Sequence, residues 1–205
     1  MNRKTIFSVV IAICVIALSA CTTAVSTTTT SGNSDTSGTS TLACSNGSTS
    51  ATLTPELTEG PYFTANSPER ASLLEAGMAG TKLVITGYVY TSDCKPVANA
   101  LLDFWQANAH GEYDNAGYTL RGHQFTDANG RYQLTTIVPG IYTGRTEHIH
   151  VKVQAPNGKF ITTQLFFPGV AQNDSDGIYD QSLLLSIQET GDGLQGQYNF
   201  VVPAP

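Results

Sequence analysis

The stretch Pro139-Gly-Ile-Tyr-Thr-Gly-Arg-Thr-Glu-His-Ile-His150 runs directly into Val151-Lys-Val153. From His148 onward polar and apolar residues alternate, which is typical of a β-strand because side chains two positions apart share a face. One face is predicted to point into a core through Ile149, Val151 and Val153. His148 and His150 then project together from the other face and can bind one metal ion. A hydrophilic strand edge with chance histidines is the alternative, although the whole chain has only four His.

The segments around this stretch also have the composition of short strands separated by turns. Residues rich in Val, Ile, Thr and aromatics alternate with clusters of Gly, Pro, Asn and Asp. The predicted strands cover residues 82–90, 100–106, 124–126, 131–137, 149–154, 160–167, 183–189 and 196–202. The turns Asp127-Ala-Asn-Gly130 and Ala155-Pro-Asn-Gly158 predict hairpins, and residues 67–75 predict one short helix. This pattern indicates an all-β fold, an antiparallel β-sandwich with few short helices, whose long loops carry the function.

The first 20 residues are organised like a secretory signal peptide. Arg3 and Lys4 precede an apolar run, Ile6 to Ala17, that is shorter than the roughly 20 residues of a membrane-spanning helix. The run ends in Leu18-Ser-Ala-Cys21, which resembles the lipobox of bacterial lipoproteins. The resemblance implies cleavage before Cys21 and a lipid anchor on its sulfur, and Thr22 favours the outer membrane, facing the periplasm or the exterior. An ordinary signal peptide with a stray cysteine is the alternative.

Residues 21–52 are predicted to be the lipidated cysteine and a flexible tether. The segment is almost entirely Ser, Thr, Gly and Ala, which bury too little apolar surface to offset the entropy of ordering. Residues 53–205 then form one domain of about 150 residues, an ordinary domain size. A Cys44–Cys94 disulfide would suit an exported protein and pin the end of the tether to the domain, with two free thiols as the alternative.

The charge balance argues against a nucleic-acid partner. Cleavage after residue 20 leaves 8 basic and 16 acidic residues, a formal charge of −8 with His neutral. A nucleic-acid-binding protein carries a basic patch or stripe, and this chain has no such footprint.

A set of short motifs follows one another along the domain. They are Trp105-Gln-Ala-Asn-Ala-His-Gly-Glu-Tyr113, Thr126-Asp-Ala-Asn-Gly-Arg-Tyr132, Ile137-Val-Pro-Gly-Ile-Tyr142, Arg145-Thr-Glu-His-Ile-His150 and Thr163-Gln-Leu165. Each motif alone is weak. Together, and in this order, they resemble the intradiol ring-cleavage dioxygenases, which include catechol 1,2-dioxygenases and protocatechuate 3,4-dioxygenases. The match runs from about Thr58 to Tyr179.

The resemblance implies a non-haem Fe(III) ion held by two tyrosines and two histidines. On this chain the implied ligands are Tyr113, Tyr142, His148 and His150. Tyr113 would stay bound, whereas the catechol would displace Tyr142, whose phenolate then accepts a substrate proton. Arg145 would stabilise negative charge on the substrate, and Gln164 would support it by hydrogen bonding. The chemistry fits, because Fe(III) is hard and highly charged, and bound metal charge deprotonates ligands such as phenol, whose free pKa is about 10.

The implied activity is cleavage of a catechol by O₂ between its two hydroxyl-bearing carbons, giving a cis,cis-muconate. Taken singly, the site residues have ordinary explanations. A lone tyrosine is most often a half-buried aromatic, Arg145 a surface residue and Gln164 a partner in sheet hydrogen bonding. Tyr62 has no ligand position in the family motif and is interpreted as pocket wall or core. The other candidates are interpreted as loop or packing residues: His110, His123, Asp103 and Trp105.

The sequence also departs from the best-known members of that family. The loop from Tyr142 to His148 is shorter than in catechol or protocatechuate enzymes, a form that looks like the exported branch. Glu147 replaces a Pro or small residue, and either points to solvent or reduces activity. The helical N-terminal dimerisation region of catechol 1,2-dioxygenases has no counterpart, which leaves substrate identity and oligomeric state open.

Two other classes of function remain open at this point. The repeated short strands also look like transthyretin-like sandwich modules that only bind or space, although such a module leaves the histidine pair and both tyrosines unexplained. A zinc or Fe(II) enzyme, either a hydrolase or an extradiol dioxygenase, would keep the metal and change the chemistry.

Overall fold

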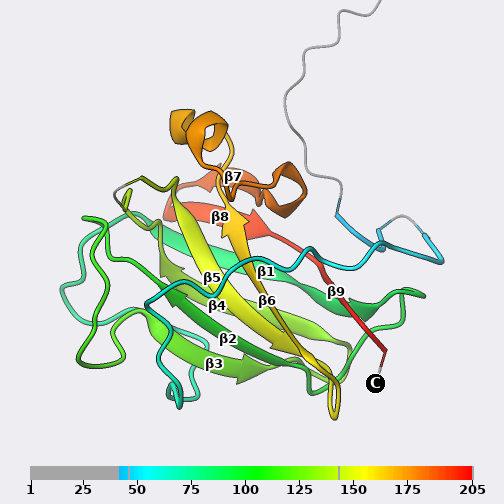
Figure 1. Cartoon of the computed structure of the whole chain (residues 1–205). Coiled ribbons are helices and arrows are strands. Elements are labelled where there is room, and N and C mark those ends of the chain that lie inside the picture. The colour runs from blue at the N-terminus through cyan, green and yellow to red at the C-terminus, as the bar shows by residue number, and fades with distance from the viewer. Residues whose placement is uncertain (1–41, 46, 143, 205) are drawn as a thin grey trace, which may run out of the picture. The chain divides into compact units, whose positions relative to one another are not determined.

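Two β-sheets face each other in the computed structural model, which describes residues 42–45, 47–142 and 144–204 (Figure 1). The strands are β1 Lys82–Thr91, β2 Leu101–Gln106, β3 Arg121–Phe125, β4 Arg131–Ile137, β5 His148–Gln154, β6 Phe160–Phe166, β7 Ser186–Thr190, β8 Gly193–Gln197 and β9 Phe200–Val202. The 3₁₀ helices are η1 Ala171–Ser175 and η2 Gln181–Leu183. One sheet has the order β3-β2-β5-β6, and the other has β4-β1-β8-β7 with β9 also paired to β1. The predicted all-β sandwich is confirmed.

The core lies between the sheets and is built from the alternating apolar positions of the strands. On β5, Ile149, Val151 and Val153 are each 0% exposed, as the alternation predicts. Burying one such side chain stabilises the fold by about 1.5–3 kcal/mol. Since a shift of one residue would turn the whole apolar set outward, this burial also fixes the direction in which His148 and His150 point.

The β5–β6 hairpin is confirmed, but the hairpin expected around Asp127–Gly130 is wrong. The turn itself forms, with the Gly130 amide donating to the Asp127 carbonyl at 3.0 Å. The flanking strands then separate, because β3 pairs with β2 in one sheet while β4 pairs with β1 in the other. Turn residues dictate a local reversal of the chain, whereas the sheet that each strand joins depends on the distant strands beside it.

Two further expectations differ from the structure. Residues 67–75 form no helix; the backbone amides of Arg70 and Leu73 donate to the carbonyls of His123 and Thr135, each at 2.8 Å. This extended course places Leu73, 0% exposed, in the core. The strand expected at 196–202 is divided into β8 and β9, and both run parallel to β1, so this sheet is mixed rather than purely antiparallel.

The segment before the sandwich is fastened to it. Cys44 and Cys94 form a disulfide, which confirms the pairing over the free thiols, and the Asn199 side chain donates to the Ala43 carbonyl at 2.8 Å. The predicted signal peptide and the Cys21 anchor lie outside the described residues, and the domain boundary at residue 53 stays a prediction. Within the described part of the chain, no helix is long and apolar enough to cross a membrane.

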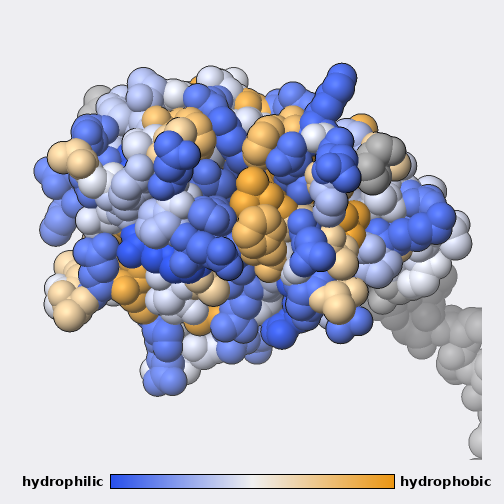
Figure 2. Space-filling view, turned by 90° about the horizontal axis from the view of Figure 1, so that it is seen from below, coloured by the Kyte–Doolittle hydropathy of each residue, from blue (hydrophilic) through white to orange (hydrophobic). Residues whose placement is uncertain are grey.

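The outer face of the β3-β2-β5-β6 sheet is crossed by the segment that leads into residue 63. In Figure 1 this cyan segment passes in front of β5 and β6, and the Leu57 amide donates to the Thr162 carbonyl of β6 at 2.8 Å. The crossing brings residues near 60 over the histidines of β5. Seen from below, the surface is largely hydrophilic, with hydrophobic residues gathered in a central band (Figure 2).

Candidate active site

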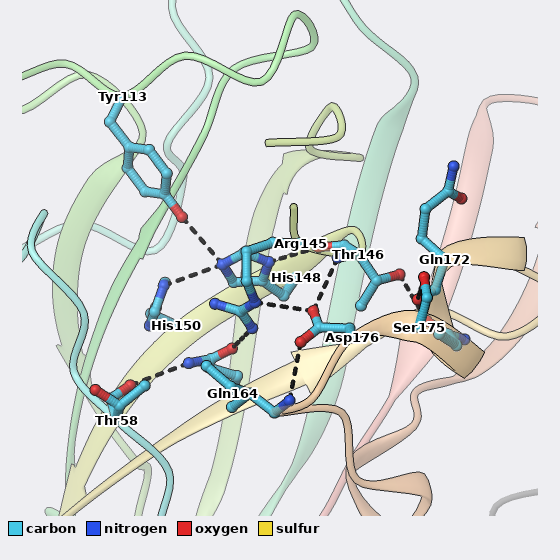
Figure 3. Close-up of polar contacts among 12 residues, drawn as sticks. Thr58, Tyr113, Arg145, Thr146, His148, His150, Gln164, Gln172, Ser175 and Asp176 are labelled. Carbon is cyan, nitrogen blue, oxygen red and sulfur yellow. Dashed lines mark hydrogen bonds and ion pairs between the residues drawn. The ribbon is translucent and has the colours of Figure 1, made fainter. Parts of the chain in front are cut away.

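His148 and His150 form the centre of the site on the outer face of β5. Their side chains are buried, and their Nε2 atoms lie 3.1 Å apart (Figure 3). Trp105 of β2 is the register partner of His150, and the two rings stack with centroids 4.7 Å apart and planes 10° apart. The packing role expected for Trp105 is therefore confirmed, since its indole stacks on the His150 imidazole and restricts the orientation of that ring.

His148 has a fixed tautomer. Its Nδ1 lies 2.6 Å from the Thr146 carbonyl oxygen, which can only accept, so Nδ1 carries the proton and Nε2 keeps its lone pair. Burial lowers the pKa of His148 to about 4, and burial also lowers the pKa of His150 well below its usual value. Both rings are neutral at pH 7, the form in which imidazole binds metals.

Tyr113 reaches the histidines from the loop after β2. Its Oη lies 3.2 Å from Nε2 of His148. The loop is held from behind by the buried Arg121, whose Nε and Nη2 donate to the Asp114 carbonyl at 3.2 and 2.8 Å. The Asp114 carboxylate in turn accepts from the amides of residues 116, 117 and 119. Burial raises the pKa of Tyr113, so the phenol stays protonated until a nearby cation favours the phenolate.

A second pair of phenols lies beside this group. The Tyr62 hydroxyl donates to Oη of Tyr142 at 3.1 Å, and the Tyr62 ring stacks on Tyr113 with centroids 4.3 Å apart. Tyr142 meets Tyr113 edge to face at 6.0 Å between centroids. Tyr62 thus lines the site, in keeping with a pocket-wall role, and its hydroxyl also contacts Tyr142, a predicted ligand. The sequence signal for this is the preceding Gly60-Pro61, which is typical of a turn that fixes the next side chain.

Arg145 and Gln164 are joined in one hydrogen-bonded network beside the histidines (Figure 3). Arg145 Nη2 donates to Gln164 Oε1 at 2.6 Å, and Gln164 Nε2 donates to the Thr58 carbonyl at 3.0 Å. Arg145 Nε donates to Asp176 at 2.8 Å, and the same carboxylate oxygen accepts from the Thr146 amide at 2.9 Å. Sequence reasoning missed Asp176, and its only local signal is an acid next to Gly177 in a loop.

The donor set fits a metal ion. Two donors about 2.1 Å from one ion, with bonds about 90° apart, are about 3 Å from each other. The atoms here, Nε2 of His148, Nε2 of His150 and Oη of Tyr113, have neighbour distances of 3.1 and 3.2 Å. Within residues 42–45, 47–142 and 144–204 no group of three or more His, Cys, Asp or Glu could hold a metal. The third donor available beside the two imidazoles is therefore the Tyr113 phenol oxygen, a donor type that suits a hard cation.

The remaining candidates lie away from this centre. His110 is an exposed loop residue, as expected, but His123 is on β3 rather than in a loop, and its Nδ1 donates to the Ser67 carbonyl at 2.7 Å. Asp103 accepts from the Ser67 hydroxyl at 2.7 Å. Glu147 is half-buried, and burial raises its pKa.

Comparison with known proteins gives one consistent result. A family model described as "Dioxygenase" matches residues 58–202. The catechol 1,2-dioxygenase 2 of Acinetobacter lwoffii is 34% identical over 142 residues, which cover 57% of this chain and 52% of that protein. The protocatechuate 3,4-dioxygenase beta chain of Burkholderia cepacia is 36% identical over 108 residues, 44% of this chain and 46% of that protein. The chain thus spans about half the length of the curated relatives it matches.

Solved structures agree with the sequence matches. The dioxygenase domain of a dioxygenase–carbohydrate-binding protein fusion from Streptomyces sp. SirexAA-E is 48% identical, with a TM-score of 0.74 over 75% of this chain and 100% of that one. A 3-chlorocatechol 1,2-dioxygenase from Rhodococcus opacus is 32% identical, with a TM-score of 0.69 over 74% of this chain and 73% of that one.

Proposed function

Because the chain belongs to the intradiol ring-cleavage dioxygenase family, we propose that it uses Fe(III) and O₂ to open a catecholic ring between its two hydroxyl-bearing carbons. The product is a cis,cis-muconate-type diacid. The observation that carries this proposal is the position of His148, whose Nε2 lies 3.2 Å from Oη of Tyr113 and 3.1 Å from Nε2 of His150. A further phenol, Tyr142, packs edge to face against Tyr113. A transthyretin-like module that only binds or spaces does not account for this arrangement.

The proposed ligands are Tyr113, Tyr142, His148 and His150. Bound Fe(III) supplies the positive charge that ionises the phenols and the catechol and makes the ring reactive toward O₂. The two imidazoles contribute neutral donors held by Thr146 and Trp105. Two ionised phenols offset most of the charge of a trivalent ion, which a pair of neutral histidines alone would leave uncompensated.

The contact between Tyr142 and Tyr62 supports a role for both residues in moving the substrate proton. Oη of Tyr142 accepts a hydrogen bond from Tyr62 at 3.1 Å. When a catechol enters, the Tyr142 phenolate takes up a substrate proton, and Tyr62 holds the resulting phenol out of the way. Arg145, held by Asp176 and Gln164, presents positive charge to the ring-opening substrate.

The substrate is proposed at the level of its class, a small catecholic aromatic. Several matched relatives are named for catechol, chlorocatechol or hydroxyquinol. Export and the lipid anchor on Cys21 are part of the same proposal. The Cys44–Cys94 disulfide supports export, because structural disulfides persist in oxidising compartments.

An anaerobic visible spectrum tests this function. The iron-loaded protein is expected to show a tyrosinate-to-Fe(III) absorption band that shifts when catechol is added, and admission of O₂ then yields the muconate. His148→Ala removes the central donor and is expected to lose both the metal and the colour. A wild-type protein that stays colourless after iron loading contradicts the proposal: bound metal without colour favours a zinc or Fe(II) site, and a folded protein without metal favours the transthyretin-like module.

A further inference from the structure

We propose that Asp176 is a positioning residue that holds Arg145 and the main chain at Thr146 in the arrangement that the substrate and the His148 ligand require. The effect on substrate and metal rests on the proposed function, whereas the hydrogen bonds of Asp176 are observed whatever the function is. It assigns a role in the site to the loop after η1, which carries none of the family motifs.

Both oxygens of the Asp176 carboxylate accept hydrogen bonds. One oxygen accepts from Arg145 Nε at 2.8 Å and from the Thr146 amide at 2.9 Å, and the other accepts from the Ile178 amide at 2.9 Å. The side chain is only 1% exposed, and the Arg145 side chain is 16% exposed. A carboxylate buried to this degree is stable only with such partners, so the pairing has one well-defined geometry rather than the many of a surface ion pair.

The first consequence concerns the guanidinium of Arg145. Asp176 accepts a hydrogen bond from Nε, and Gln164 Oε1 accepts one from Nη2 at 2.6 Å. The side-chain amide of Gln164 in turn donates to the Thr58 carbonyl at 3.0 Å. Since the guanidinium group is planar, two fixed nitrogens fix the direction of the third. Nη1, which has no recorded hydrogen bond among the described residues, is left as the donor for a substrate oxygen.

The second consequence concerns His148. Thr146 is held at its amide by Asp176 and at its hydroxyl by Asn173, to which it donates at 2.6 Å. The carbonyl of the same residue accepts from His148 Nδ1 at 2.6 Å. Asp176 and Asn173 therefore clamp the residue that orients the imidazole, and groups that orient a ligand in this way typically change metal affinity or activity by roughly 10- to 100-fold when mutated.

The test compares Asp176→Asn with Asp174→Asn. Both substitutions remove one carboxylate charge from the η1 region, but Asp174 is exposed and its side chain makes no hydrogen bond to the described residues. An amide at 176 loses the charge and one acceptor, so we expect the anaerobic dissociation constant for catechol to rise roughly 10- to 100-fold and the affinity for Fe(III) to fall. Asp174→Asn is expected to match the wild type in both. Equal behaviour of the two variants overturns the proposal.

A double-mutant cycle separates positioning from general damage. If Asp176 acts on the substrate through Arg145, then Asp176→Asn has little further effect on catechol binding in an Arg145→Ala background, yet it still lowers metal affinity through Thr146. Full additivity in catechol binding contradicts the role assigned to Arg145. Thermal unfolding of each variant shows whether it is folded.

One measurement is made on the wild-type protein and does not depend on bound iron; the variant that assigns the signal is checked for folding by thermal unfolding. In the metal-free wild-type protein, the Arg145 Nε–H group is expected to give a ¹⁵N-correlated NMR signal protected from solvent exchange, identified by its loss in Arg145→Lys. Rapid exchange of that signal overturns the proposal. Failure of the wild type to bind iron or catechol counts instead against the proposed function, while the NMR result still decides the Asp176–Arg145 contact.

Discussion

Tyr62→Phe tests the role proposed for the hydrogen bond between Tyr62 and Tyr142, a proposed metal ligand. The substitution keeps the ring, and with it the stacking on Tyr113 at 4.3 Å, and removes only the hydroxyl that donates to Tyr142 at 3.1 Å. A neutral hydrogen bond of this kind contributes about 0.5–1.5 kcal/mol, equivalent to a factor of about 2–12 in an equilibrium constant.

The direction of the effect follows from which position of Tyr142 the bond stabilises. In the proposed reaction Tyr142 gives up its place to the catechol, and we predict that the hydrogen bond from Tyr62 stabilises the displaced Tyr142 more than the bound one. Loss of that hydroxyl disfavours displacement, so the catechol dissociation constant is expected to rise about 2- to 12-fold while the iron content stays unchanged.

The assay is an anaerobic titration of the iron-loaded protein with catechol, followed by the visible band. Tyr198→Phe is the matched control, because it removes a hydroxyl that donates to the Ser182 carbonyl at 3.3 Å. Tyr198 lies between β8 and β9, two strands of the other sheet. Unchanged or tighter catechol binding by Tyr62→Phe, with Tyr198→Phe equal to wild type, would refute the reasoning.

Two further predictions concern stability. Burial lowers the pKa of His148 from 6.5 to about 4 in the folded protein, so on acidification the unfolded chain takes up a proton before the folded protein does. In the metal-free protein, His148 should therefore leave the free energy of unfolding unchanged above pH 6.5 and lower it by up to about 3 kcal/mol as the pH falls to about 4. Urea unfolding across this range measures it, and a flat profile contradicts the neutral buried imidazole. Replacing Cys44 and Cys94 together by Ala opens a loop with a sequence separation of 50 residues, which by loop entropy lowers the free energy of unfolding by about 4 kcal/mol. Catechol turnover at low temperature should persist, and a thermal midpoint equal to wild type would show that the bridge adds nothing.

The sequence was most informative where the structure is local. The alternation from His148 to Val153 was enough to predict which side chains enter the core between the sheets and which two lie together on the outer face, because side-chain direction in a strand has a period of two. The turn at residues 155–158 likewise predicted the β5–β6 pairing. The same kind of argument failed at residues 127–130, where the reversal of the chain is correct and the strand pairing is not.

The candidate ligands were found by residue type and motif order, but the residues that hydrogen-bond to the site from distant segments were not. Tyr62 lies 80 positions from Tyr142, Thr58 lies 106 positions from Gln164, and Asp176 lies 31 positions from Arg145. No periodicity or spacing rule connects residues so far apart. The local signals at Tyr62 and Asp176 are turn residues such as Gly60-Pro61 and Gly177, and they do not indicate which distant side chain either residue contacts.

The sequence by itself thus determined an all-β chain with a histidine pair on one strand face and the donor types that suit a hard cation. Only the tertiary structure decided that β3 and β4 belong to different sheets, that Tyr62 contacts a candidate ligand phenol and that a buried carboxylate binds Arg145. The physical reason is that alternation and turn chemistry act between neighbours along the chain. Burial of a charge or a hydroxyl, by contrast, is decided by which distant segments pack around it.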